Sequence, residues 1–173
     1  MTRLYWVQGP WPGKLALSAR PRGGDWLDDE VAGWRKEGIS TVVSLLTPEE
    51  EQELSLELEA SQVLGSGLSF VSLAIPDRQA PSTVTEMQSA IQGLDRTLSS
   101  GKNVLVHCRQ GIGRSGLVAA SLLVNRGWTP RLAMKELSDL RGTRVPETAE
   151  QEEWIERYAA KVIPQREPKV ASR

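Results

Sequence analysis

The residues best suited to chemistry lie in the stretch HCRQGIGRSG, from His107 to Gly116, which holds the only histidine and the only cysteine of the chain. A cysteine thiolate is a strong nucleophile, and glycines allow successive backbone N–H groups to turn inward around an anion. Arg114 can add a two-pronged contact to two oxygens of a tetrahedral anion. The stretch therefore predicts a nucleophile, Cys108, beneath a bound phosphate or similar anion.

The elements on either side of this stretch fit such a site. Residues 103–107 form a short, mostly apolar run typical of a buried strand, and residues 114–127 form an almost wholly apolar run typical of a central helix. The loop between them then lies at a strand's carboxyl end and a helix N-terminus, where free N–H groups and the helix dipole favour anions. The same setting favours the thiolate form of a cysteine.

Strand-like and helix-like stretches alternate along the rest of the chain. Further strands are predicted at 14–21, 39–46 and 68–74, and helices at 25–38, 84–98, 130–141 and 147–162. The acidic stretch 47–60 is expected to form a helix with a solvated face, begun by a capping box of Thr47 and Glu50. The alternation predicts one α/β domain within residues 1–163, with a flexible tail at 164–173. Its central, mostly parallel sheet should have about four to five strands, with helices on both faces.

Composition narrows the classes of function. The 173 residues are 39% hydrophobic and 25% charged, and the formal net charge of −1 predicts no general attraction to nucleic acid or acidic membranes. A single cysteine cannot form an internal disulfide, and no stretch of about 18 apolar residues or basic leader is present. We therefore expect a monomeric, cytoplasmic protein with no nucleic-acid or membrane partner. Trp6, Trp11, Trp26 and Trp34 are expected to pack onto the core rather than form an aromatic platform for a ligand.

The stretch from His107 to Gly116 resembles the signature loop of the cysteine-dependent protein tyrosine and dual-specificity phosphatases. That signature, His-Cys-x-x-Gly-x-Gly-Arg-Ser-Gly, contains the CX5R spacing and is matched at every specified position. Further similarity in the stretches GISTVVSLLT, IPD and LRGTRVPETAEQ extends the resemblance over about residues 13–158. These stretches resemble the small atypical dual-specificity and kinase-associated phosphatases. The resemblance implies a protein tyrosine phosphatase-like fold that hydrolyses phosphoproteins through a phosphocysteine intermediate, with no metal or cofactor. Phosphotyrosine is the first candidate substrate, and phosphoserine and phosphothreonine are further ones.

The resemblance also implies roles for individual residues. Cys108 attacks phosphorus, and Ser115 helps the thiolate to leave in the second step. His107 mainly orders the loop and supports a low pKa of the cysteine. The general acid is expected on a loop about thirty residues upstream, and Asp77 in IPDRQAP stands 31 residues before Cys108. Alternatively, Asp77 only begins a turn beside Pro76. The phosphate oxygens are bound by the loop residues Arg109, Gln110, Gly111, Ile112, Gly113 and Arg114.

Several alternatives stay open at the level of sequence. An inositol phosphate or other small-molecule phosphatase would use the same chemistry. The loop lacks the paired lysines that inositol-lipid phosphatases carry, although Arg78 and Arg109 could supply some of that charge. A phosphoprotein-binding module without turnover and a sulfurtransferase are the alternatives from other classes. Arg141 and Arg144 are candidates for a basic rim or for ordinary surface ion pairs, and Gln151 either positions water or is an ordinary surface residue.

Overall fold

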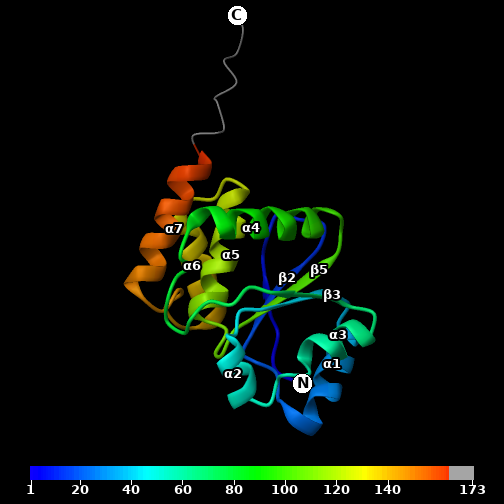
Figure 1. Ribbon diagram of the computed structural model, residues 1–173. Coiled ribbons are helices and arrows are strands. Elements are labelled where there is room, and N and C mark those ends of the chain that lie inside the picture. Colours follow the sequence, from blue (N-terminus) through cyan, green and yellow to red (C-terminus); the bar gives the residue numbers. More distant parts are fainter. Residues whose placement is uncertain (164–173) are drawn as a thin grey trace, which may run out of the picture.

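A five-stranded sheet lies at the centre of the computed structural model, which describes residues 1–163 (Figure 1). The strand order is β1-β2-β5-β3-β4, and only β1 runs antiparallel to its neighbour. The strands are β1 (Tyr5–Val7), β2 (Leu15–Ser18), β3 (Ile39–Ser44), β4 (Ser69–Ser72) and β5 (Asn103–His107). The predicted mostly parallel sheet is confirmed, but β1 makes it mixed. The sequence did not predict β1, because its three residues are too few to show the alternation that is typical of a strand. The predicted tail at 164–173 lies outside the described residues.

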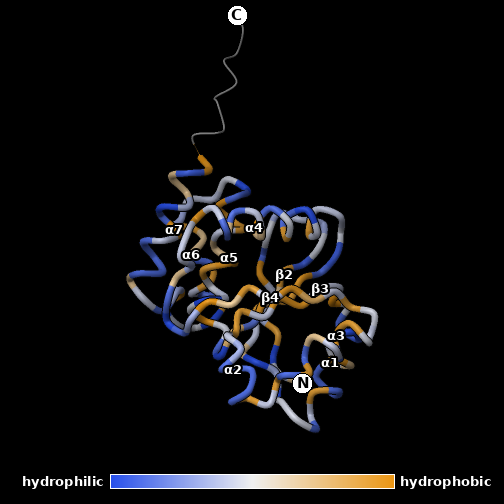
Figure 2. The backbone as a smooth tube through the Cα atoms, viewed as in Figure 1, coloured by the Kyte–Doolittle hydropathy of each residue, from blue (hydrophilic) through white to orange (hydrophobic). Residues whose placement is uncertain are grey.

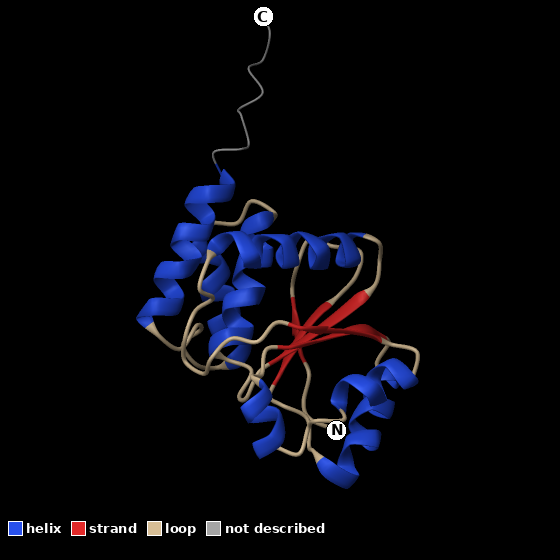
Figure 3. Cartoon of the chain, viewed as in Figure 1, coloured by secondary structure: helices blue, strands red, loops and turns tan. Residues whose placement is uncertain are grey.

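Helices cover both faces of the sheet (Figure 3). One face packs against α4 (Val84–Ser99), α5 (Gly113–Asn125) and α6 (Pro130–Arg141), with α7 (Ala149–Val162) packed against α5. The other face packs against α1 (Leu27–Lys36) and α3 (Glu59–Gly65). The central strand β5 shows why both faces are covered. Val104 and Val106 belong to one core and Leu105 to the other, as expected for side chains that alternate across a strand. Figure 2 shows the apolar residues gathered in the strands, while the outer sides of the helices are hydrophilic.

The acidic stretch forms two short helices, α2 (Pro48–Glu53) and α3, instead of one. The predicted capping box of Thr47 and Glu50 is confirmed at the start of α2. The chain then turns at Ser55, which has a left-handed φ of 56°, and Leu56 enters the core. The predicted solvated face is wrong for Glu50 and Glu59, which are only 7% and 1% exposed.

The N-terminal tryptophans follow the prediction in part. Trp11 and Trp34 are buried in the core. Trp26 is 56% exposed and belongs to a short 3-10 turn (Gly24–Trp26) that precedes α1, so the predicted packing is wrong there.

Within residues 1–163, no helix is both long enough and apolar enough to cross a membrane.

Candidate active site

The nucleophile loop, residues 108–113, links β5 to α5 as predicted. Cys108 is 3% exposed, and its Sγ accepts a hydrogen bond from the N–H of Gly111 at 3.2 Å. Gly111 has a φ of +69°, and a Cβ at this position would lie 2.3 Å from the carbonyl oxygen of Ser18. Glycine is therefore required there, and it allows the loop backbone to curl toward the sulfur.

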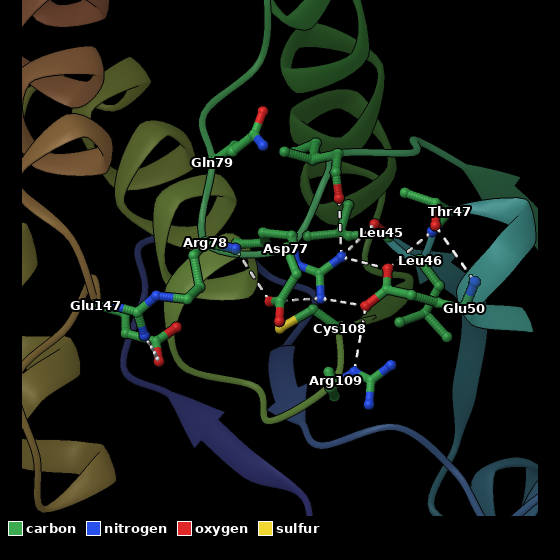
Figure 4. Close-up of polar contacts among 12 residues, drawn as sticks. Leu45, Leu46, Thr47, Glu50, Asp77, Arg78, Gln79, Cys108, Arg109 and Glu147 are labelled. Atoms are coloured by element: carbon green, nitrogen blue, oxygen red, sulfur yellow. Dashed lines mark hydrogen bonds and ion pairs between the residues drawn. The ribbon is translucent and has the colours of Figure 1, made fainter. Parts of the chain in front are cut away.

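Arg114, in the first turn of α5, contacts groups from two other segments, α2 and the loop that follows β4 (Figure 4). Its Nη1 donates to Oε2 of Glu50 at 2.7 Å and to the carbonyl oxygen of Ile75 at 2.8 Å. Its Nη2 donates to Oε1 of Glu50 and to Oδ1 of Asp77, both at 2.9 Å. Burial opposes the positive charge, but the hydrogen bonds with Glu50 and the charges of Cys108, Glu50 and Asp77 together raise the pKa of Arg114. The site therefore has a permanent, buried cation beside the cysteine.

Glu50 is a site residue that the sequence analysis described only as a helix cap. Besides the two bonds from Arg114, its carboxylate accepts hydrogen bonds from the N–H of Thr47 at 3.0 Å and from Nε of Arg109 at 3.3 Å. Burial acts to raise the pKa of Glu50, but these partners lower it to about 2. The capping box was a usable signal for the position of Glu50, but it does not indicate that the carboxylate also faces the site.

The acid loop, residues 75–82, follows β4 and carries the candidate general acid. The Asp77 side chain is 48% exposed, and its ion pair with Arg114 places it at the edge of the nucleophile loop. Its Oδ1 also accepts a hydrogen bond from the N–H of Arg78 at 3.0 Å. Asp77 thus makes the turn contact expected of an aspartate in such a loop and also reaches the site.

A cavity of about 130 Å³ opens between the two loops. The candidate acid comes from a different part of the chain than the candidate nucleophile and arginine, yet all three line this one cavity. Its lining residues are Asp77, Arg78, Cys108, Gln110, Gly113, Arg114 and Glu147. The structure therefore brings together Cys108, Arg114 and Asp77, the nucleophile, cation and acid that the sequence assigns to one site.

The acid loop is anchored to the residues around the start of α7. Nη1 of Arg78 lies 2.8 Å from Oε1 of Glu147. The side chain of Gln151 is fully buried: its Nε2 donates to the carbonyl oxygen of Gln79 at 3.1 Å, and its Oε1 accepts from the N–H groups of Glu147 and Thr148. The alternative of an ordinary surface glutamine is therefore wrong, because Gln151 connects the acid loop to a helix cap.

Arg141 supports the nucleophile loop from the opposite side. Its Nε donates to the carbonyl oxygen of Gly111 and its Nη2 to that of Gln110, both at 3.0 Å, and its guanidinium lies 3.6 Å from the centre of the Tyr5 ring. Arg144 forms a surface ion pair with Glu152. Neither arginine forms the basic rim that the sequence left open: Arg141 binds loop carbonyls, and Arg144 is the ordinary surface residue.

The other predicted site residues are placed as follows. Ser115 is buried, but its Oγ has no hydrogen-bond partner among the described residues, so the bond to Cys108 that a leaving-thiolate role calls for is not formed. The Arg109 side chain turns to Glu50 and Glu53, while Gln110 lines the cavity. Phosphate binding by the loop N–H groups, including that of Ile112, stays a prediction.

Within residues 1–163, no three His, Cys, Asp or Glu side chains are grouped so that they could hold a metal ion.

Comparison with known proteins identifies relatives of this site and fold. The sequence model of the family described as polymorphic toxin system, DSP-PTPase phosphatase matches residues 18–128, which include both loops. Cyclin-dependent kinase inhibitor 3 of Sus scrofa is 34% identical over 90 residues, which cover 51% of this chain and 42% of that protein. The match thus spans less than half of that relative.

Two solved structures share the fold over nearly the whole chain. Kinase associated phosphatase, with a serine in place of its catalytic-site cysteine, superimposes with a TM-score of 0.84 at 21% identity, covering 94% of this chain and 96% of that one. Tk-PTP in its active form superimposes with a TM-score of 0.75 at 26% identity, covering 92% of this chain and 97% of that one.

Proposed function

The chain belongs to the polymorphic toxin system DSP-PTPase phosphatase family, and from this premise we propose that it is a cysteine-dependent phosphatase of dual-specificity type. The observation that carries the proposal is the single cavity lined by Cys108, Arg114 and Asp77. Cleavage of a phosphate monoester needs a nucleophile, a cation that binds the phosphate oxygens and a carboxyl group that donates a proton.

In the first step, the Cys108 thiolate attacks phosphorus, an S–P bond forms and the P–O bond to the leaving group breaks. Arg114 and the loop N–H groups bind the nonbridging phosphate oxygens. An incoming phosphate competes with the Asp77 carboxylate for Nη2 of Arg114, which releases Asp77 to face the leaving oxygen. Once released from Arg114, the carboxylate takes up a proton from water, and it then gives this proton to the leaving oxygen.

In the second step, water attacks the phosphocysteine. The new P–O bond replaces the S–P bond, Asp77 takes the proton of the water, and inorganic phosphate and the thiolate are formed. The Ser115 hydroxyl, which has no hydrogen-bond partner among the described residues, is available to donate to the departing sulfur.

Charge around the cavity favours a substrate with one phosphate group on a protein. The two arginines that could bind additional phosphates are already paired, Arg78 with Glu147 and Arg109 with Glu50 and Glu53. An inositol polyphosphate would have to displace these carboxylates. The names of the relatives, cyclin-dependent kinase inhibitor 3 and kinase associated phosphatase, also support a phosphoprotein substrate.

The proposal is tested by assaying the pure protein, with a chelator present, on peptides containing phosphotyrosine, phosphoserine or phosphothreonine and on inositol phosphates. We expect peptide hydrolysis, and Cys108→Ser should reduce it by more than about 1,000-fold while keeping peptide binding, because only the nucleophile is lost. An active Cys108→Ser protein contradicts the mechanism. Faster hydrolysis of inositol phosphates supports the small-molecule alternative, and wild-type binding without turnover supports the binding module.

A further inference from the structure

A second cavity lies outside the active site, between the start of α1 and the turn that leads from α2 to α3 (Figure 1). Its volume is about 300 Å³. We call it the α1–α3 cavity. Its lining includes both acidic and apolar side chains, among them Asp25, Leu27, Asp28, Glu57, Leu58 and Gln62. The catalytic steps described above use none of these residues.

The two chain segments that form this cavity are fixed to each other. The N–H of Gly24 donates to the carbonyl oxygen of Ser55 at 2.9 Å. Gly23 packs so closely on the same turn that a Cβ at this position would lie 2.1 Å from the carbonyl oxygen of Leu54. The cavity is therefore part of the folded structure and is already formed without a ligand.

The α1–α3 cavity exposes groups that folded proteins usually cover. Leu58, which lines it, is 63% exposed, and Trp26, which stands between two lining residues in the chain, is 56% exposed. Gln62 also lines the cavity, and its Oε1 is buried without a hydrogen-bond donor among the described residues. A buried acceptor is costly until a donor meets it, and exposed apolar patches often mark interaction sites. The cavity thus lacks one donor and an apolar cover.

The rim of the cavity is negatively charged. Asp25, Asp28 and Glu57 form no ion pair with any other residue of the part of the chain that the structure describes. The arginine closest to them in the sequence, Arg22, is already paired with the buried carboxylate of Glu30. No cation of the described chain therefore offsets the charge of the rim, which fits a positively charged ligand.

A basic segment of another protein fits these features better than other occupants do. A small cation would leave Trp26 and Leu58 uncovered. A second copy of this chain, in a symmetric contact, would bring the same carboxylates together, and like charges repel. A segment rich in lysine or arginine neutralises the rim, can donate to Gln62, and can place an apolar side chain on Leu58.

We propose that the α1–α3 cavity is a docking site for a basic segment of the phosphoprotein substrate, in which lysines or arginines flank an apolar side chain. The position of the cavity supports this partner. It adjoins the end of α2, and the same helix carries Glu50 and Glu53, which bind Arg114 and Arg109 of the active site. A docked segment therefore keeps the substrate beside the nucleophile loop. Only the identity of the partner as the substrate rests on the proposed function, because docking is measured without turnover.

The first experiment measures peptide binding to the wild-type protein by fluorescence anisotropy. The probe is a short labelled peptide of lysines with two central leucines. One comparison peptide has glutamates in place of the lysines, and the other has serines in place of the leucines. We expect the probe alone to bind tightly, and added salt should raise its Kd because it screens the charges. Failure of the probe to bind, or equal binding of either comparison peptide, overturns the proposal.

Variants then test whether the probe binds at this cavity. Asp28→Asn/Glu57→Gln removes two charges of the rim and should weaken binding by about tenfold. The matched control, Glu153→Gln/Glu156→Gln, removes two exposed carboxylates of α7, which packs on the other side of the sheet, and should leave the Kd unchanged. An equal loss of affinity in the control overturns the proposal.

Gln62→Leu separates binding from stability. Loss of the unpartnered acceptor should weaken binding, while urea unfolding should show a protein at least as stable as the wild type. Asp28 also lies in the first turn of α1, where an acidic side chain favours the helix dipole. If the variants of the rim lose stability but keep their affinity for the probe, these carboxylates serve only the fold and the proposal is wrong.

The last experiment tests the substrate as the partner. A phosphotyrosine peptide joined to the probe by a flexible linker should have a KM about tenfold lower than the same peptide without the probe, at unchanged kcat, because docking raises the local concentration of the phosphate. Asp28→Asn/Glu57→Gln should remove this gain. Docking without hydrolysis counts against the proposed function alone, whereas hydrolysis without the gain overturns the assignment of the substrate as the partner. A dimer in sedimentation that Leu58→Ser dissociates would assign the cavity to a second copy and would also overturn it.

Discussion

The two loops of the active site are held in place in different ways. The nucleophile loop is continuous with a central strand and a central helix, and both Cys108 and Arg114 are almost fully buried. The acid loop lies at the surface, where Asp77 is half exposed and Arg78 and Gln79 are tied to the start of α7 by polar contacts. Packing therefore fixes the nucleophile and the phosphate site, whereas a few hydrogen bonds set the position of the proton donor. Substitutions in the two loops should therefore change different properties of the protein, and the sizes of their effects should also differ.

The largest effect is expected at Glu50, the buried charge that supports the nucleophile loop. Its pKa is lowered from the ordinary value of 4.5 to about 2 in the folded protein. The carboxylate therefore adds stability above pH 4.5 that is lost as the pH falls toward 2, and at neutral pH this amounts to about 3 kcal/mol. We expect Glu50→Gln to lower the free energy of unfolding by about this amount at pH 7 and progressively less below pH 4.5, as measured by urea unfolding.

Glu51 is the control for this prediction because it lies on the same helix. Burial raises its pKa, so folding gains nothing from the ionised form of this carboxyl. Glu51→Gln should leave stability at pH 7 unchanged or slightly higher. A loss in Glu50→Gln that is the same at all pH values would show that packing, and not charge, supports the loop.

Asp77→Asn should have the next largest effect, and it should depend on the substrate. The variant cannot protonate a leaving group, so we expect about a 100-fold loss of kcat on phosphotyrosine peptides or phenyl phosphate. A nitrophenolate leaves without a proton, and hydrolysis of nitrophenyl phosphate should change little. Steady-state kinetics on both substrates test this difference. An equal loss on both would mean that Asp77 supports the nucleophile loop through Arg114 instead of acting as the acid.

The same contrast explains how much of the site the sequence could predict. The nucleophile loop is a contiguous pattern at a strand-to-helix junction, so Cys108, Arg114 and the loop glycines were predictable together. Asp77 could be placed because it directly follows a strand. Glu50 and Glu59 were missed because acidic residues in a helical stretch usually face solvent, and the local pattern does not show that both side chains are buried here.

The supporting contacts of the site could not be predicted from local pattern at all. Arg141 reaches the carbonyl of Gly111, 30 residues away in the chain, and Gln151 reaches the carbonyl of Gln79, 72 residues away. Both contacts depend on how α6 and α7 pack beside the loops. A backbone carbonyl also leaves no mark in the sequence that could identify it as the partner of a distant side chain.

Arg141→Met should weaken the nucleophile loop by a moderate amount. Methionine keeps an apolar contact with the Tyr5 ring but loses both donors to the loop carbonyls. We expect about a tenfold loss of kcat/KM, equal for phenyl and nitrophenyl phosphate, because the phosphate site moves while the acid is intact. Arg144→Met removes a surface arginine three residues along the chain and should have no effect. A loss confined to phenyl phosphate would contradict the assignment of Arg141 to the nucleophile loop.

The smallest effect is expected for Gln151→Glu, which loosens the acid loop alone. A carboxylate can still accept hydrogen bonds from the N–H groups at the start of α7, and a capping box accepts either residue. It cannot donate to the carbonyl of Gln79, and loss of one neutral hydrogen bond corresponds to about a threefold loss of rate. We expect that loss on phenyl phosphate and little change on nitrophenyl phosphate, together with some loss of stability because the new carboxylate is buried. Gln92→Glu, on the exposed side of α4, is the control for the added charge. The Gln151 amide also lies close to Gly113, so an equal loss on both substrates would mean that Gln151 supports the nucleophile loop and that the two loops are not held independently.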